Sequence, residues 1–187
     1  MLLISFDIGI RNLAVALLEL TSDGLTVHEL KNISLCAAEE KIPGLDQLSQ
    51  SCFAALDELI GERVVHTVLL ENQPVMKNPL MKSVQMLIYS YFQLRHHWNG
   101  DFEKILMVSA TMKLKGHDFE LPPTDKTGYK RNKWAAVELA KLYCQDDDTL
   151  RAIWTKRKAD DLADALCQAL SWIRRNLPEQ PVQLRSV

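Results

Sequence analysis

The fold is decided by a stretch near the C-terminus that reads Lys158-Ala159-Asp160-Asp161-Leu162-Ala163-Asp164-Ala165-Leu166. Apolar residues recur at helical spacing from this stretch onward, at Ala159, Leu162, Ala163, Leu166, Leu170 and Ile173. One face of this predicted helix therefore packs against a core. Its three aspartates fall off that face, and Asp164 lies one turn from the other two. Like charges at this spacing are costly unless solvated or neutralised. We therefore expect either a solvated acidic edge or one wall of a metal site.

Length and composition predict one globular domain that covers residues 1–187. A chain of 187 residues is long enough for one sizeable core and too short for two comfortable ones. No apolar run reaches the ~20 residues that span a bilayer, and the first residues lack the basic region of a signal peptide, so no membrane association is expected. The net charge of −2 excludes a histone-like polycation, and any nucleic-acid binding must use local basic patches.

The four cysteines are widely spaced and form no C-x-x-C pair; they are Cys36, Cys52, Cys144 and Cys167. This spacing argues against a structural zinc site and against a disulfide framework. It favours a reducing, intracellular location.

Strands and helices alternate along the chain in an α/β pattern. Three strands with tight turns between them, at residues 2–8, 13–20 and 25–35, predict an antiparallel meander. Two further strands are expected at 64–70 and 104–110, and helices at 45–60, 79–98, 134–143 and in the C-terminal stretch, with a loop at 111–130 and an acidic linker at 146–148. The expected fold class is α/β, with a five-stranded mixed sheet flanked by helices.

Two further acids fall near the ends of predicted strands. Asp7 lies near the end of the first strand, and Glu71 terminates the fourth. In open α/β sheets, sites form at strand ends, so these acids meet if the two strands are neighbours. The last helix then brings Asp164 and a companion, Asp160 or Asp161, across the gap. Carboxylates without Cys or His ligands suit Mg²⁺ or Mn²⁺, and two such ions support phosphodiester cleavage.

Basic residues predict a phosphate-binding rim around these acids. The residues assigned to it are Lys113, Lys115, Lys130, Arg131, Lys156, Arg157 and Lys158. Tyr129 and Trp134 are candidates for stacking on unpaired bases. Each lysine alone is better explained as solubilising charge, and Trp134 is equally suited to the core.

Three motifs resemble those of RuvC-like Holliday junction resolvases, in the family's order and near its spacing. They are Ser5-Phe6-Asp7-Ile8-Gly9-Ile10-Arg11-Asn12-Leu13-Ala14, Leu70-Glu71-Asn72-Gln73-Pro74, and residues 158–165 of the opening stretch. The poxvirus and other large-DNA-virus branch and the fungal mitochondrial enzymes look most similar. The resemblance implies an RNase H-like fold and a homodimeric endonuclease. It implies paired symmetrical nicks in four-way DNA junctions, with two Mg²⁺ ions for which Mn²⁺ substitutes, in DNA recombination and repair.

The resemblance also implies the roles of single residues. Asp7, Glu71 and Asp164 match the family's metal-binding acids. The spacing of bacterial and poxvirus-like relatives gives Asp161 as the fourth ligand, which we prefer, whereas that of fungal relatives gives Asp160. Lys133, at the end of the basic segment 129–133, matches the catalytic lysine through a looser motif.

The position of the first predicted strand bears on the origin of the protein. This strand begins almost at residue 1, so we expect neither a mitochondrial presequence nor an added N-terminal DNA-binding domain. This expectation favours a viral or phage enzyme.

Three other functions fit parts of the pattern. A different RNase H-like nuclease, which cuts RNA–DNA hybrids or flaps, needs the same acids. An actin-like ATPase also opens with an Asp-x-Gly strand, but it needs a duplicated domain and a far longer chain. A non-catalytic junction-binding protein has no need of the complete set of acids.

Overall fold

The computed structural model describes residues 1–37, 41–76, 78–100, 104–155 and 159–187. Its centre is a mixed sheet with the strand order β5-β4-β1-β2-β3-β6. The strands are β1 (Leu2–Asp7), β2 (Leu13–Thr21), β3 (Gly24–Ile33), β4 (Thr67–Glu71), β5 (Lys104–Val108) and β6 (Leu184–Ser186). The first three are antiparallel, as predicted, and β4 and β5 run parallel to β1.

The expectation of five strands is wrong, because the sheet has a sixth strand at the C-terminal end. In β6, Leu184 pairs with Leu25 of the parallel strand β3. Three residues are too few to show the alternation by which strands are recognised. The carboxylate of Asp147 holds this strand, since its Oδ2 accepts hydrogen bonds from the backbone nitrogen and the hydroxyl of Ser186, at 2.7 and 2.8 Å.

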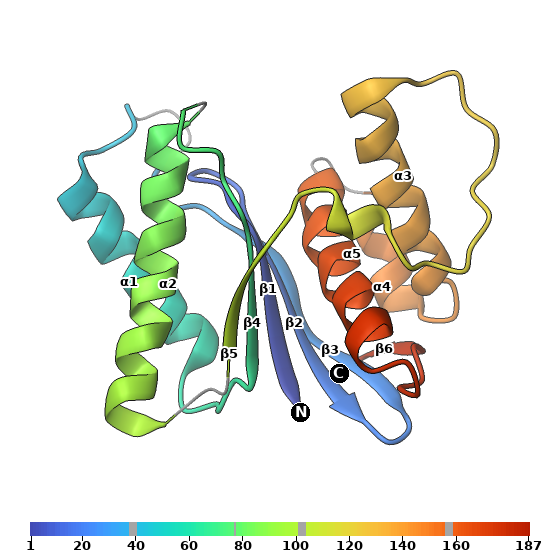
Figure 1. The fold of residues 1–187 in the computed structure, drawn as a ribbon, viewed down its shortest axis with the longest axis horizontal. Coiled ribbons are helices and arrows are strands. Elements are labelled where there is room, and N and C mark those ends of the chain that lie inside the picture. Colours follow the sequence, from blue (N-terminus) through green and yellow to red (C-terminus); the bar gives the residue numbers. More distant parts are fainter. Residues whose placement is uncertain (38–40, 77, 101–103, 156–158) are drawn as a thin grey trace.

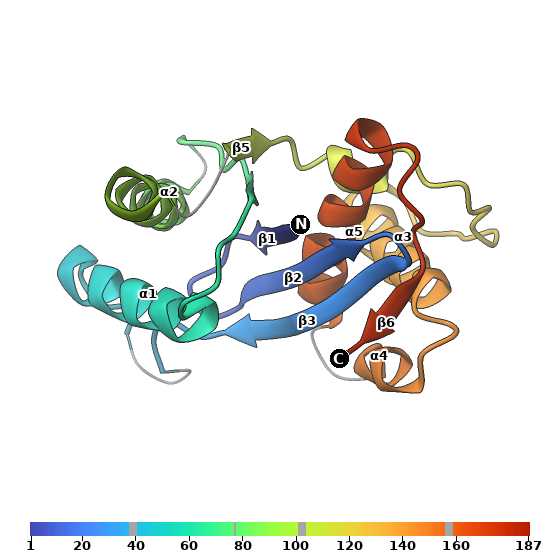
Figure 2. The ribbon, with the colours of Figure 1, turned by 90° about the horizontal axis from the view of Figure 1, so that it is seen from below.

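Helices cover both faces of the sheet. Figures 1 and 2 show α1 (Leu45–Ile60) and α2 (Pro79–Asn99) on one face, and α3 (Gly128–Tyr143), α4 (Asp148–Ile153) and α5 (Ala159–Asn176) on the other. None of the described helices is both long and apolar enough to cross a membrane.

Two helical segments differ from the expected boundaries. Helix α3 begins at Gly128, six residues before the predicted start, because its first turn is exposed and shows no apolar periodicity. The predicted acidic linker contains the start of α4, where the side chain of Asp147 accepts a hydrogen bond from Leu150 N at 2.9 Å and caps the helix. The predicted loop 111–130 also contains a short 3₁₀ helix, η1 (Met112–Leu114).

The core has two apolar layers, one on each face of the sheet. Along β2, Ala14 and Ala16 point into the layer shared with α5, whereas Leu13, Val15 and Leu17 point into the layer shared with α1 and α2. Helix α5 contributes small residues of its own, including Ala163, to the first layer. Small side chains on both sides allow α5 to pack close to the sheet.

This arrangement brings the predicted site together at one edge of the sheet. Strands β1 and β4 are parallel neighbours, so their carboxyl ends lie at the same edge. Helix α5 begins at that edge and runs back along the sheet; the edge is at the top of Figure 1.

Candidate active site

Asp7 and Glu71 form a hydrogen-bonded carboxyl pair at the ends of β1 and β4. Phe6 is in register with Leu70, which places the two acids side by side. Burial, together with the hydrogen bond to Glu71 and its negative charge, raises the pKa of Asp7 from 3.8 to about 9. Two adjacent carboxyl groups away from water cannot both ionise without a compensating cation. The nearby charge of Lys113 opposes this shift but does not cancel it, so the Asp7 carboxyl favours its protonated form at neutral pH.

The aspartates of α5 differ greatly in exposure. The side chain of Asp164 is only 2% exposed, that of Asp161 is 23% exposed and that of Asp160 is 43% exposed. The sequence placed all three outside the apolar face, but Asp164 is buried because it points toward the acid pair and two lysines. A buried carboxylate needs compensating charge.

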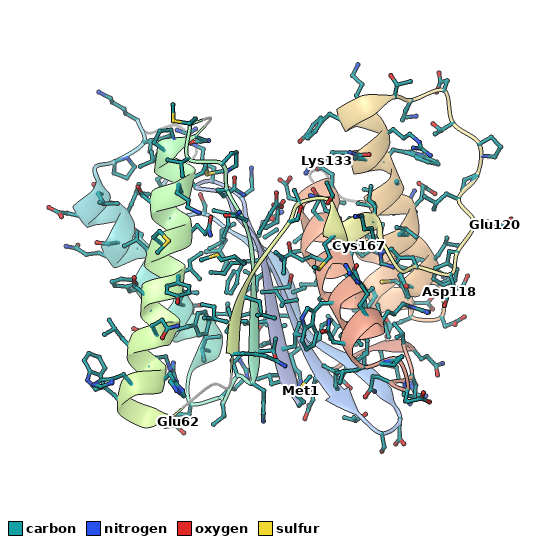
Figure 3. All side chains as sticks on the ribbon, viewed as in Figure 1. Met1, Glu62, Asp118, Glu120, Lys133 and Cys167 are labelled. Carbon is teal, nitrogen blue, oxygen red and sulfur yellow. The ribbon has the colours of Figure 1, made fainter. Side chains whose placement is uncertain are left out.

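Lys133 of α3 provides part of that charge, and Figure 3 shows it beside the upper end of α5. Its Nζ lies 2.8 Å from Asp161 Oδ1, 2.7 Å from Asp164 Oδ2 and 3.5 Å from Asp160 Oδ2. Burial alone would lower the pKa of Lys133, but the charges of Asp164 and Asp161 outweigh burial and raise it. The lysine is therefore a permanent cation.

Lys113 of η1 provides the second cation. Its Nζ lies 2.7 Å from Asp164 Oδ2 and 3.6 Å from Glu71 Oε2. Burial opposes its charge, but Asp164 and Glu71 raise its pKa above the ordinary value. The sequence assigned this lysine to a phosphate-binding rim, whereas the structure places it among the acids. One lysine from η1 and one from α3 thus share a single buried carboxylate oxygen.

Two side chains of the surrounding core hold Lys113 in place. The hydroxyl of Ser171 lies 2.7 Å from the carbonyl oxygen of Met112 and 2.6 Å from that of Lys115. His117 Nε2 lies 2.8 Å from the carbonyl oxygen of Lys113 itself. Sequence reasoning missed both residues, because Ser171 reaches a segment far away in the sequence and His117 lies in a stretch without periodicity.

Two cavities border the acids. One, of about 330 Å³, is lined by Glu71, Lys113, Tyr129, Asn132, Lys133 and Asp164. The other, of about 280 Å³, is lined by Asp7, Gly9, Arg11, Asn12, Met81 and Asp161. A Cβ atom on Gly9 would lie 2.3 Å from the carbonyl oxygen of Asn12, so only glycine permits this turn after Asp7.

Of the remaining predicted basic residues, three lie on the described surface and three fall outside the described residues. Lys115, Lys130 and Arg131 are exposed, and Lys130 and Arg131 lie in the first turn of α3, three and two residues before Lys133. The other predicted phosphate contacts, at positions 156–158, lie outside the described residues.

Comparison with known proteins identifies the family. A family model described as Poxvirus A22 protein matches residues 1–176. The chain belongs to the poxvirus A22 protein family. An uncharacterized protein, L451, of Acanthamoeba polyphaga mimivirus is 30% identical to this A22-family chain over 138 residues. That match covers 68% of this chain but only 31% of the mimivirus protein, so the chain spans about a third of that relative's length.

Solved structures with similar folds include three resolvases. The fowlpox virus resolvase, in complex with Holliday junction DNA, has a TM-score of 0.65 and 17% identity, with 95% of this chain and 99% of that chain covered. The yeast mitochondrial Holliday junction resolvase Ydc2 has a TM-score of 0.62 and 17% identity, with coverages of 92% and 78%. RuvC of T. thermophilus, also with a junction, has a TM-score of 0.58 and 12% identity, with coverages of 94% and 96%. The expected RNase H-like fold and the resemblance to RuvC-like proteins are confirmed.

The clustered carboxylates of this A22-family protein are the type of ligand that divalent metal ions such as Mg²⁺ prefer. Within the described parts of the chain, no group of three or more His, Cys, Asp or Glu side chains is arranged to hold an ion as it stands. Two observations still favour a cation there. Burial and the adjacent Glu71 raise the pKa of Asp7, and Asp164 Oδ1 is a buried acceptor without a hydrogen-bond partner among the described residues. Oxygen donors of this kind suit Mg²⁺ or Mn²⁺.

Proposed function

We propose that this protein is a structure-selective endonuclease that resolves four-way DNA junctions by paired symmetrical nicks. The observation that carries the proposal is the convergence of Asp7, Glu71, Asp164 and Lys133 at one edge of an RNase H-like sheet. Membership of the A22 family supports it. So does the similarity of fold to the fowlpox, yeast and T. thermophilus proteins, which are themselves described as resolvases or bound to junctions.

The proposed metal ligands are Asp7, Glu71, Asp161 and Asp164. Asp160 is the alternative to Asp161, but it is more exposed and lies farther from Lys133. When bound, two Mg²⁺ ions supply an activated water and stabilise the leaving oxygen. Lys133 holds the carboxylates of Asp161 and Asp164 at fixed positions. It also places a positive charge beside the site, where charge develops on the scissile phosphate.

The DNA backbone approaches across the exposed start of α3 in this proposal. Lys130 and Arg131 lie there, and Lys115 directly follows η1, which contacts α3. Tyr129 is 75% exposed and lines the same cavity as Glu71 and Asp164. An aromatic ring at this position can stack on an unpaired base next to the scissile phosphate.

We further propose that residues 1–187 act as one domain and assemble as a homodimer. A four-way junction has two-fold symmetry, so two equivalent sites can cut opposing strands. Helix α2 carries exposed apolar side chains, Met86, Leu94 and Trp98, the last of which is 72% exposed. They suit an interface with a second copy. Family membership supports a viral enzyme that acts where viral DNA replicates.

The test is incubation of the protein and Mg²⁺ with four labelled substrates: a four-way junction, a duplex, a flap and an RNA–DNA hybrid. Cutting of the junction alone, at paired positions, is the expected result. Equal cutting of all four would overturn the assignment, and preferential cutting of the hybrid or flap would favour a different RNase H-like nuclease. Hydrolysis of ATP without DNA would point to an actin-like enzyme.

A further inference from the structure

Two buried glutamines lie on opposite faces of the sheet, one in contact with the strand that carries Asp7 and the other with the segment that follows Glu71. We propose that Gln85 of α2 and Gln168 of α5 are positioning residues that set the geometry of the metal-binding carboxylates. The inference rests on the proposed function in one respect, namely that these carboxylates hold a divalent ion. Neither glutamine touches a carboxylate itself, so their effect acts through the backbone.

Gln168 joins the helix that carries Asp164 to the strand that carries Asp7. It lies one helical turn after Asp164, and only 2% of its surface is exposed. Its Nε2 donates hydrogen bonds to Ser5 Oγ at 3.0 Å and to the carbonyl oxygen of Phe6 at 3.2 Å. Phe6 directly precedes Asp7, so this amide fixes the position of α5 along β1 within one residue of the acid.

Gln85 joins α2 to the segment that follows Glu71. It is fully buried. Its Oε1 accepts hydrogen bonds from the backbone nitrogen of Gln73 at 2.8 Å and from Lys82 Nζ at 3.2 Å. Lys82 Nζ also donates to Asn72 Oδ1 at 3.0 Å. The two residues after Glu71 are therefore tied to α2, in the layer opposite α5.

The choice of an amide at both positions supports a positioning role. Each glutamine lies in a helix whose other buried residues are mostly apolar, and a buried polar group costs free energy unless it is hydrogen-bonded. Apolar contacts would fill the space but would tolerate small shifts of a helix along the sheet. Hydrogen bonds to single backbone atoms are directional and oppose such shifts. Hydrogen-bonded partners outside the metal's ligands orient those ligands, and the glutamines would do the same one step farther out, through the backbone beside each acid.

The test uses Gln168→Met and Gln85→Met, which keep the length of each side chain and remove its amide. Ile173→Val and Ile88→Val are matched controls, since each removes buried volume from the same helix. The probe is Mn²⁺ alone, with its binding measured by electron paramagnetic resonance, beside thermal unfolding in a chelator. We expect each glutamine variant to bind Mn²⁺ about 10-fold more weakly, the lower end of the loss for a direct partner of a metal ligand, because the glutamines act through the backbone. The controls should lose stability and bind Mn²⁺ as the wild type does.

Ser5→Ala is a milder variant that removes one of the two acceptors of Gln168, and it keeps the test decisive if Gln168→Met does not fold. It should weaken Mn²⁺ binding in the same direction but less. Wild-type affinity in the folded glutamine variants and in Ser5→Ala would overturn the proposal, as would a wild type that binds no Mn²⁺. If the variants lose Mn²⁺ affinity but the wild type cuts no branched DNA, the positioning role stands and the proposed function fails.

Discussion

The ammonium nitrogen of Lys113 lies 2.7 Å from Oδ2 of Asp164, a carboxylate that is almost fully buried. Lys133 contacts the same oxygen at the same distance. The two lysines come from η1 and α3, and they neutralise the most buried acid of α5 from two sides. The repulsion expected among the three aspartates of this helix is thereby relieved. A bound divalent ion would relieve it in the same way.

Removal of Lys113 should destabilise the metal-free protein. We expect Lys113→Met to lower the free energy of unfolding by up to about 3 kcal/mol, the lower end of the cost of breaking a buried ion pair, because Lys133 still contacts Asp164. Chemical denaturation in a chelator measures this change. Lys141→Met, which breaks only the exposed pair with Glu138, is the control and should have little effect. Equal losses in both variants would contradict the buried ion-pair account.

Loss of a single acid of the proposed metal site should separate binding from cutting. Asp7→Asn and Asp164→Asn each remove a charged ligand while keeping the shape of the side chain. We expect both variants to bind a four-way junction with near wild-type affinity in a gel-shift assay and to cut it only at background level. A variant that cut at the wild-type rate would refute the metal-site model.

The fourth ligand can be identified by comparing two neighbouring aspartates. Asp161 lies 2.8 Å from Lys133, whereas Asp160 lies 3.5 Å away and is more exposed. Asp161→Asn should therefore lower the cleavage rate by more than the roughly 10- to 100-fold typical of an outer partner. Asp160→Asn should lower the cleavage rate by less than Asp161→Asn does. The reverse order would assign the ligand to Asp160.

The acid pair predicts a pH dependence of stability in the absence of divalent ions. The pKa of Asp7 is about 9 in the folded protein and 3.8 ordinarily, so the folded state binds more protons between these values. Its contribution to stability is full below about pH 4 and is lost as the pH rises toward 9. The unfolding temperatures of wild type and Asp7→Asn are measured in a chelator from pH 5 to 9. As the pH rises, the wild type should lose stability relative to the variant. A constant difference would contradict the raised pKa of Asp7.

Periodicity predicted most of the fold because most elements bury one face. The four long helices and five of the strands leave an apolar pattern, whereas β6 and α4 are too short to show one. The first turn of α3 was missed for a related reason, since its exposed residues Tyr129 and Lys130 carry no apolar signal.

The candidate site was predictable where it depends on strand ends. Asp7 and Glu71 follow from the positions at which β1 and β4 end, and the beginning of α5 supplies Asp164. The place of Lys113 among the acids was not predictable, because hydrogen bonds from Ser171 and His117 position its segment. The two glutamines were missed as well, since the partner of Gln168 lies on β1, far away in the sequence, and that of Gln85 lies in an irregular segment after β4.

The most direct test of the account is to map the nicks in a four-way junction that carries a label on each strand in turn. With Mg²⁺ present, the protein should nick two opposing strands at symmetry-related positions and release two nicked duplexes. The Asp164→Asn variant should bind the same junction and leave all four strands intact. Cuts confined to one strand, or cuts in a matched linear duplex at the same rate, would contradict the assignment of this protein as a junction resolvase.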